Sequence, residues 1–337
     1  MSWRSPNASP ISRAFAAAFV LAMPLAPAGN APADPIGVRA LPVALNPEKP
    51  RMTTVGKLAF MSGLELVSDE GRFGGLSGLE VSPDGRRLRA VSDRGHWITA
   101  ALAHDSAERL VGASRWRATA MLTPAGRPVR RYQRDAEGLA RRSRNAFLVS
   151  FEGRHRIWRY PPAFDVPPTR MASPPSLKDA PVNGGLEAIT VLADGQILGV
   201  TERYANGDGS LKGWFMENGA AHEIAYVPGD GFSPTDLAAM PNGDALLLER
   251  SFNLLGMRAR LVRLGKGRLQ EARRRAGARL HGDLLAALER PLSVDNFEGL
   301  ALRRDRAGRT LLYLVSDDNF VPLQRTLLLQ FRLIDDL

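Results

Sequence analysis

Acidic residues recur through the chain at the ends of short apolar segments. Five precede such a segment, namely Glu80, Glu137, Glu187, Asp236 and Glu298. Five more end the next apolar segment, namely Asp93, Glu152, Glu202, Glu249 and Asp317. The chain has no Cys and only five His, so a metal site would depend on oxygen ligands. The ten acids therefore predict a divalent cation site, with Ca²⁺ favoured and Mg²⁺ or Mn²⁺ as alternatives.

A tight turn separates the two acids of each pair. Glu187 and Glu202, for example, are equally far from the turn Asp194-Gly195. Residues equidistant from the turn of an antiparallel hairpin lie opposite each other. The spacing therefore predicts that each hairpin opposes two carboxylates and that the pairs gather at one rim. Such a rim needs a cation, an arginine or protonation to relieve the repulsion. Purely structural ion pairing is the alternative interpretation.

Three arginines directly follow a second acid: Arg94, Arg203 and Arg250. The guanidinium group binds phosphate and carboxylate through two parallel hydrogen bonds. These three residues are therefore predicted to bind an anionic substrate. Four of the acids, Glu137, Glu187, Glu202 and Glu298, are predicted to act in catalysis as well as in metal binding.

The acids lie on a unit that repeats about every fifty to sixty residues. The third unit contains four short apolar segments, at 186–191, 196–201, 213–216 and 222–227. Four short strands per repeat are typical of a β-propeller blade. We predict an all-β fold, a β-propeller of five four-stranded antiparallel blades. Pairing of an N-terminal strand at 58–67 with a C-terminal strand at 327–333 would close the ring.

Two features of this fold have alternatives. Six blades would result if residues 58–75 formed half of a degenerate blade. One or two helical turns are expected in 282–288 and in the Arg-rich stretch before it.

The N-terminus has the pattern of a secretory signal peptide. Arg4 and Arg13 precede an apolar stretch at 14–25, which small residues follow up to Ala33. The sequence predicts a signal peptide at 1–33, an extended segment at 34–54 and the propeller at 55–337. An apolar helix of the fold is the alternative for the first segment. We expect a periplasmic or secreted monomer that does not insert stably into a membrane.

The net charge is +10, and nearly all of the positive charge is Arg. No basic block with interleaved aromatic residues accompanies this charge, so nucleic-acid binding is not predicted. A small anionic substrate is the expected partner.

Several strings, taken in order, resemble the phytase-like family, described as "esterase-like activity of phytase". They are Gly75-Leu76-Ser77-Gly78-Leu79, Ser92-Asp93-Arg94-Gly95, Asp135-Ala136-Glu137-Gly138, Asn183-Gly184-Gly185-Leu186-Glu187, Asp295-Asn296-Phe297-Glu298-Gly299 and Ser316-Asp317-Asp318-Asn319-Phe320. The resemblance implies a β-propeller hydrolase acting on phosphate esters, with the shared acids as its site. The sequence departs from the family at Ala136, where Pro is usual, and at 184–186, where Lys-Gly-Phe is usual.

Three functions follow from these observations. The first is hydrolysis of a phosphomonoester or phosphodiester, assisted by a divalent metal. The second is a non-catalytic propeller that binds a ligand or a partner. The third is a metal-dependent lactonase. No Gly-x-Ser-x-Gly nucleophile motif is present, so a serine esterase is not predicted.

Overall fold

The structure is a computed structural model that describes residues 1–3, 34–253 and 256–334 of the chain. Within Ala31–Leu337, the described residues form one compact unit. The predicted signal peptide at 1–33 lies outside the described residues except for its first three, and it stays a prediction. Among the described residues, no helix is long and apolar enough to cross a membrane.

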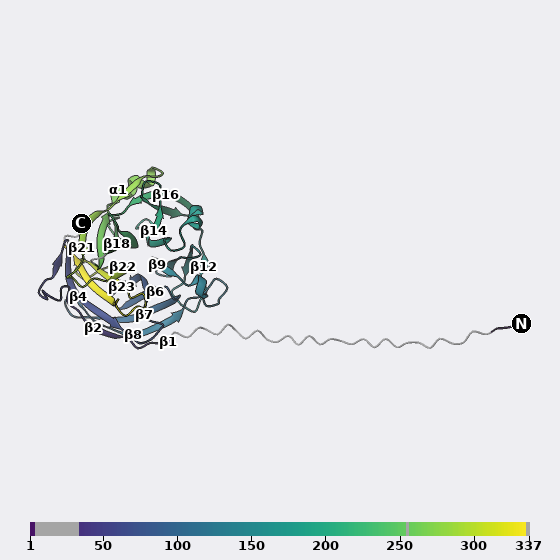
Figure 1. Cartoon of the computed structure of the whole chain (residues 1–337), viewed down its shortest axis with the longest axis horizontal. Helices are drawn as coiled ribbons and strands as arrows, with labels where there is room; N and C mark the ends of the chain where they lie inside the picture. The colour runs from purple at the N-terminus through teal and green to yellow at the C-terminus, as the bar shows by residue number, and fades with distance from the viewer. Residues whose placement is uncertain (4–33, 254–255, 335–337) are drawn as a thin grey trace. The chain divides into compact units, whose positions relative to one another are not determined.

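Five antiparallel sheets form a ring (Figure 1). The first blade contains β5 (Leu76–Val81), β6 (Arg87–Ser92), β7 (His96–His104) and β8 (Leu110–Ala120). The second contains β9 (Ala136–Ser143), β10 (Ala146–Phe151), β11 (Arg156–Tyr160) and β12 (Thr169–Arg170). The third contains β13 (Leu186–Val191), β14 (Ile197–Ala205), β15 (Leu211–Glu217) and β16 (Ala220–Val227). The fourth contains β17 (Ser233–Ala239), β18 (Ala245–Asn253), β19 (Gly256–Leu264) and β21 (Asp283–Leu288).

The fifth blade joins the two ends of the propeller. It contains β22 (Asn296–Arg304), β23 (Thr310–Asp317), β24 (Thr326–Leu333) and β4 (Leu58–Val67). Leu328 of β24 pairs with Leu64 of β4. The predicted five-bladed propeller and its closure by the terminal strands are therefore confirmed. The six-bladed alternative is wrong, because 58–67 completes the fifth blade.

Short elements extend the outer edges of the blades. Residues of the predicted extended segment form β1 (Asp34–Pro35) on β8, and β2 (Arg39–Pro42) and β3 (Thr54–Val55) on β4. In the third blade, β20 (Arg279–His281) pairs in parallel with β16. Two 3₁₀ segments cover Arg131–Gln133 and Pro175–Asp179.

The helix expectation is partly wrong. The Arg-rich stretch forms α1 (Lys266–Arg274), which buries Leu269 and Ala272. Residues 282–288, by contrast, are not helical but contain β21. Pairing of β21 with β19 supplies the backbone hydrogen bonds that a helix would have made internally.

The first strand of each blade lies innermost, and small residues let these strands approach. An added Cβ at Gly78 would lie 2.6 Å from the backbone nitrogen of Leu139. At Gly299 it would lie 2.9 Å from the Cβ of Leu79, and at Gly138 it would overlap the carbonyl oxygen of Glu187. Real Cβ atoms essentially never approach another heavy atom this closely. Close packing of the inner strands therefore fixes the positions of the residues that flank these glycines.

Candidate functional site

A β-bulge near the start of each inner strand shifts the register of the hairpin. In the third blade Leu186 pairs with Thr201 and Ala188 pairs with Val200, so Glu187 is the extra residue. Glu202 lies level with Gly185, to which its N–H donates a hydrogen bond of 2.9 Å. Glu187 and Glu202 therefore lie on the same rim without facing each other. The prediction that each hairpin opposes two carboxylates is wrong, because the bulge adds one residue to one strand only.

The second and fifth blades follow the same arrangement. Glu298 is the extra residue between Phe297 and Gly299, and Asp317 pairs with Asn296. Glu137 lies at the bulge of β9, and Glu152 donates its N–H to the Asp135 carbonyl at 2.9 Å.

The first blade has only one acid at this rim. Asp93 donates its N–H to the carbonyl of Gly75 at 3.0 Å, at the level of Glu152 in the second blade. Glu80, the predicted partner of Asp93, pairs instead with Arg89, further along the strand. Its carboxylate forms ion pairs with Arg89, at 2.9 Å, and with Arg141. Glu80 is therefore not part of the rim.

In the fourth blade both predicted acids lie beside the rim positions. Pro234 pairs with Glu249 and Ser233 with Arg250, and Thr235 is the extra residue. Thr235 thus has the place that Glu187 has in the third blade, and Arg250 has the place of Glu202. The predicted metal ligands Asp236 and Glu249 therefore each lie one residue away, along their strands, from the positions that face the rim.

Asp236 and Glu249 have structural partners instead. Asp236 is fully buried and accepts hydrogen bonds from the backbone N–H groups of Leu237, at 2.8 Å, and Leu300, at 2.7 Å. A third N–H, that of Leu79, also donates to it. Its carboxylate thus links the inner strands β17, β22 and β5 of the fourth, fifth and first blades.

Glu249 is also fully buried, forms an ion pair with Arg260 and accepts a 2.7 Å hydrogen bond from the Tyr226 hydroxyl. Since Tyr226 belongs to the third blade, Glu249 connects the third blade to the fourth.

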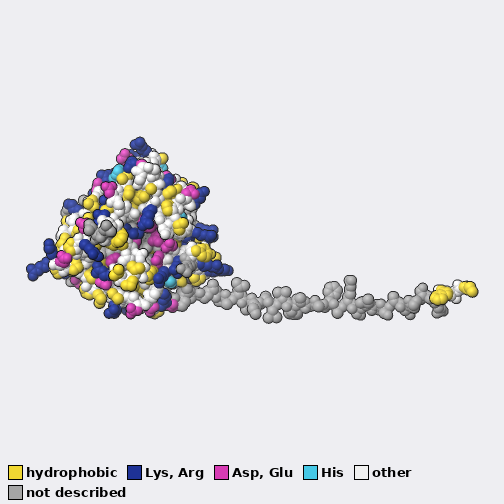
Figure 2. All heavy atoms as spheres, viewed as in Figure 1, with side chains coloured by type: hydrophobic (Ala, Val, Ile, Leu, Met, Phe, Trp, Pro, Cys, Tyr) yellow, Lys and Arg dark blue, Asp and Glu magenta, His cyan; other side chains and the backbone are white. Residues whose placement is uncertain are grey.

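Seven of the ten predicted acids lie at the rim together with Asp135, and we call these eight carboxylates the acidic cluster. Its members are Asp93, Asp135, Glu137, Glu152, Glu187, Glu202, Glu298 and Asp317. Each of these groups repels, or is repelled by, another member. Figure 2 shows acidic side chains gathered at the centre of the ring, with basic side chains beside them.

Asp135 is the member that the spacing rule missed. Its carboxylate offers an oxygen within 4.8 Å of oxygens from Glu137 and Glu152, so these three residues could hold a metal ion. The signal in the sequence is a second acid two residues before Glu137. This acid falls outside the repeat, because the other first acids that reach the rim, Glu187 and Glu298, have no acid at that distance.

Burial and mutual repulsion raise the pKa values of several members. Burial, and then Asp135, raise the pKa of Asp93 to about 6. Burial raises the pKa of Glu152 to about 7, although the N–H groups of Gly184 and Gly185 lower it. Burial raises the pKa of Glu187 well above its ordinary value, and Glu202 is the strongest repelling neighbour. The cluster is therefore short of positive charge.

Two oxygens of the cluster are buried without a hydrogen-bond partner, Oε2 of Glu187 and Oδ1 of Asp93. Glu187 is only 5% exposed. Leaving a buried charged oxygen unpaired is costly, and a bound cation would remove that cost. The all-oxygen donor set suits a hard divalent cation. The residues present thus fit a metal ion.

The three predicted substrate-binding arginines differ in their contacts. Arg250 forms ion pairs with Glu202, at 3.1 Å, and with Glu298, at 3.0 Å. Arg203 forms an ion pair with Glu202 at 2.9 Å, and its side chain is 57% exposed. Arg94 stacks on the ring of Phe320, with 3.2 Å between its guanidinium carbon and the ring centroid. Arg203 is thus exposed, Arg94 is half-buried and donates to the Gly71 carbonyl at 2.8 Å, and Arg250 is held by the cluster.

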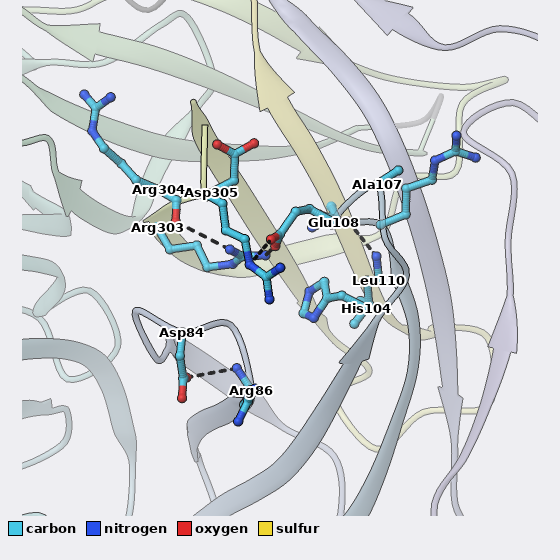
Figure 3. A network of polar contacts seen from close by, with 12 residues as sticks. Asp84, Arg86, His104, Ala107, Glu108, Leu110, Arg303, Arg304 and Asp305 are labelled. Atoms are coloured by element: carbon cyan, nitrogen blue, oxygen red, sulfur yellow. Dashed lines mark hydrogen bonds and ion pairs between the residues drawn. The ribbon is translucent and has the colours of Figure 1, made fainter. Parts of the chain in front are cut away.

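A separate cavity of about 810 Å³ lies at the opposite end of the strands, between the first and fifth blades. A polar network lines it, in which Arg303 donates to Glu108 at 2.8 Å (Figure 3). The Tyr313 hydroxyl accepts from Arg303 and Gln330, so its own proton is donated to His104 Nε2. These groups satisfy one another, and the network joins the two blades. The unpartnered oxygens identify the acidic cluster, not this cavity, as the candidate site.

The family model described as Phytase-like, "esterase-like activity of phytase", matches residues 71–320. The chain belongs to this family. The matched region contains all eight members of the acidic cluster. The family resemblance inferred from the sequence strings is therefore confirmed.

Searches of other proteins give more distant similarities. No match is found among curated protein sequences. One similar structure is XC5397, a gluconolactonase from Xanthomonas campestris, with 14% identity and a TM-score of 0.41, covering 91% of this chain and 99% of the other. Another is the β-propeller domain of Cps50 (Swd1) from Myceliophteria thermophila, with 14% identity and a TM-score of 0.36, covering 87% of this chain and 99% of the other.

Proposed function

We propose that this phytase-like chain is an exported, divalent-cation-dependent hydrolase of phosphate esters, and that the acidic cluster is its site. The observation that carries the proposal is the buried, unpartnered oxygen of Glu187 within a group of eight carboxylates. A cluster with this donor chemistry favours Ca²⁺, and Mg²⁺ or Mn²⁺ would use the same oxygens.

Asp135, Glu137 and Glu152 would hold the ion, because their oxygens lie within 4.8 Å of one another. A bound divalent ion supplies positive charge that polarises a phosphoryl oxygen. Glu152 would be held in place for this role by the N–H groups of Gly184 and Gly185, which both donate to its Oε1.

Glu187 is the candidate general base. Its Oε2 has no partner, and burial and then Glu202 raise its pKa above the ordinary value, which makes it a stronger base toward an attacking water. Exposed Arg203, and Arg94 beside Asp93, would bind the remaining phosphate oxygens. Glu202 and Glu298 would act by holding Arg250.

The test measures cation binding and hydrolysis on the purified mature chain. Ca²⁺ should raise the Tm, and p-nitrophenyl phosphate, bis-p-nitrophenyl phosphate and phytate should reveal the ester class. Glu187→Gln should lower kcat by about a hundredfold or more, in line with the loss of a general base. Asp283→Asn is the matched control, because Asp283 is 59% exposed and pairs with Arg268 away from the cluster.

The remaining outcomes separate the alternatives. Hydrolysis of δ-gluconolactone without phosphatase activity would favour a metal-dependent lactonase, for which the same oxygen ligands would serve. Cation binding without hydrolysis of any ester or lactone would favour a ligand-binding propeller. Absence of both cation binding and hydrolysis would refute the proposal.

Localisation and assembly are part of the same proposal. We propose that the N-terminal segment directs export to the periplasm or the medium and that the mature chain acts as a monomer on a small anionic substrate. Neither nucleic-acid binding nor stable membrane insertion belongs to the proposal. Mass spectrometry of the exported chain would locate the cleavage site, which we expect near Ala33, and light scattering would give the molecular mass.

A further inference from the structure

Arg250 has the position in the fourth blade that carboxylates have in the other four. It pairs with Ser233, as Asp317 pairs with Asn296 in the fifth blade. In the third blade the N–H of Glu202 bonds to Gly185 at the same level. The propeller therefore presents four acids and one arginine at five equivalent places around the rim.

Arg250 acts as a cation for one half of the acidic cluster. It forms ion pairs with Glu202, from the third blade, and with Glu298, from the fifth. Burial alone would lower its pKa, but Glu298, Glu187 and Glu202 raise the pKa above its ordinary value. A guanidinium group is weakly hydrated compared with an ammonium group and is therefore suited to such a buried position.

In the described part of the chain, the other half of the cluster has no arginine that pairs with its carboxylates as Arg250 does. Among the described residues, no arginine or lysine forms an ion pair with Asp135, Glu137 or Glu152. These three residues nevertheless bring their oxygens within 4.8 Å of one another. The chain thus supplies an ion-paired arginine on one side of the cluster, whereas on the other side Arg156 attracts Asp135 without forming an ion pair.

We infer that Arg250 takes the place of a second divalent cation, so that the cluster binds one ion and not two. The ion is held by Asp135, Glu137 and Glu152, and the Arg250 guanidinium replaces the ion that Glu187, Glu202 and Glu298 would otherwise hold. This inference rests on the cation dependence of the proposed function. It adds the number of ions bound and a second site that Arg250 occupies in the wild-type chain.

Calorimetric titration with Ca²⁺, checked by elemental analysis after removal of free metal, gives the number of ions bound. The wild-type chain should bind one ion, and Arg250→Gln should bind two, because Glu202 and Glu298 lose their ion pair with Arg250 beside the unpartnered oxygen of Glu187. Arg203→Gln is the matched control. It also removes an ion pair with Glu202, but from an exposed side chain, so it should still bind one ion. Glu152→Gln should reduce wild-type binding from one ion to none.

Each result decides between the inference and the proposed function. One ion in both wild type and Arg250→Gln would overturn the inference and leave the proposed function intact. Two ions in the wild type would overturn it without any variant, so the test survives if Arg250→Gln does not fold. Retention of the ion by Glu152→Gln would also overturn it, because the ion would lie elsewhere. No ion in the wild type would refute the cation dependence of the proposed function itself.

Discussion

Replacing Asp93 by Asn should stabilise the metal-free protein at pH 8. Asp93 has an unpartnered buried oxygen, and burial with repulsion from Asp135 raises its pKa from 3.8 to about 6. Because the folded pKa exceeds the unfolded one, folding is penalised when the group is ionised. The penalty is absent below pH 3.8 and complete above pH 6. The difference between these pKa values corresponds to about 3 kcal/mol, which solvent screening at the rim reduces to about 1 to 3 kcal/mol.

Urea unfolding in EDTA at pH 8 and pH 4 measures this effect. Asp93→Asn should raise the free energy of unfolding at pH 8 and change it little at pH 4, where wild-type Asp93 is mostly protonated. A variant that is less stable than the wild type at pH 8, or equally stabilised at both pH values, would refute the argument that the cluster is short of positive charge.

The same chemical change at Asp236 provides a contrast with the opposite expected sign. Burial raises the pKa of Asp236 as well, but its carboxylate accepts several backbone hydrogen bonds that an Asn amide cannot all accept. Asp236 accepts hydrogen bonds from Leu237, Leu300 and Leu79 on three inner strands. An Asn amide has one acceptor oxygen and places an NH₂ group against N–H donors. Each unsatisfied buried donor costs about 1 to 3 kcal/mol, so Asp236→Asn should destabilise the protein by at least that amount.

Three further predictions concern binding and packing. Ca²⁺ affinity should fall as the pH is lowered from 8 to 6, because Glu152, whose pKa is about 7, must lose its proton to bind the ion; calorimetry at both pH values would show this. Gly138→Ala should lower the free energy of unfolding by about 1 to 3 kcal/mol or prevent folding, because its Cβ would overlap the Glu187 carbonyl, and urea unfolding checks it. Arg260→Met should cost about 3 to 5 kcal/mol, because it leaves the carboxylate of fully buried Glu249 without its ion pair. Unchanged thermal unfolding of that last variant would contradict the structural role of Glu249.

The fold was predictable because turn signals and short apolar segments repeat locally. The four strands of the third blade, β13 to β16, follow the predicted segments within a few residues. Closure of the ring could also be inferred, since a strand without a blade preceded the first repeat and the last repeat lacked one strand. The secondary structure of 282–288 could not be predicted, because a short apolar run with Ala and Leu suits a helix as well as a strand. Only the free edge of β19 makes it a strand.

The register of the acids was not predictable from spacing. Counting from the turn assumes that both strands of a hairpin advance equally, and a bulge near each acid breaks this assumption. The error is small where the acid itself is the extra residue, as at Glu187 and Glu298. It is decisive in the fourth blade, where the string Leu-Leu-Glu-Arg resembles the other repeats but places Arg250 at the rim and Glu249 behind it.

The bulge also explains why neighbouring acids differ so much in their surroundings. An extra residue turns Glu187 and Glu298 toward the rim, where carboxylates from several blades repel one another. Acids that are not the extra residue of a bulge, such as Glu80 and Glu249, form ion pairs with arginines on adjacent strands. The sequence supplies the same residue type in both cases. Strand register then decides which carboxylates are neutralised within the chain and which still require a cation from outside it.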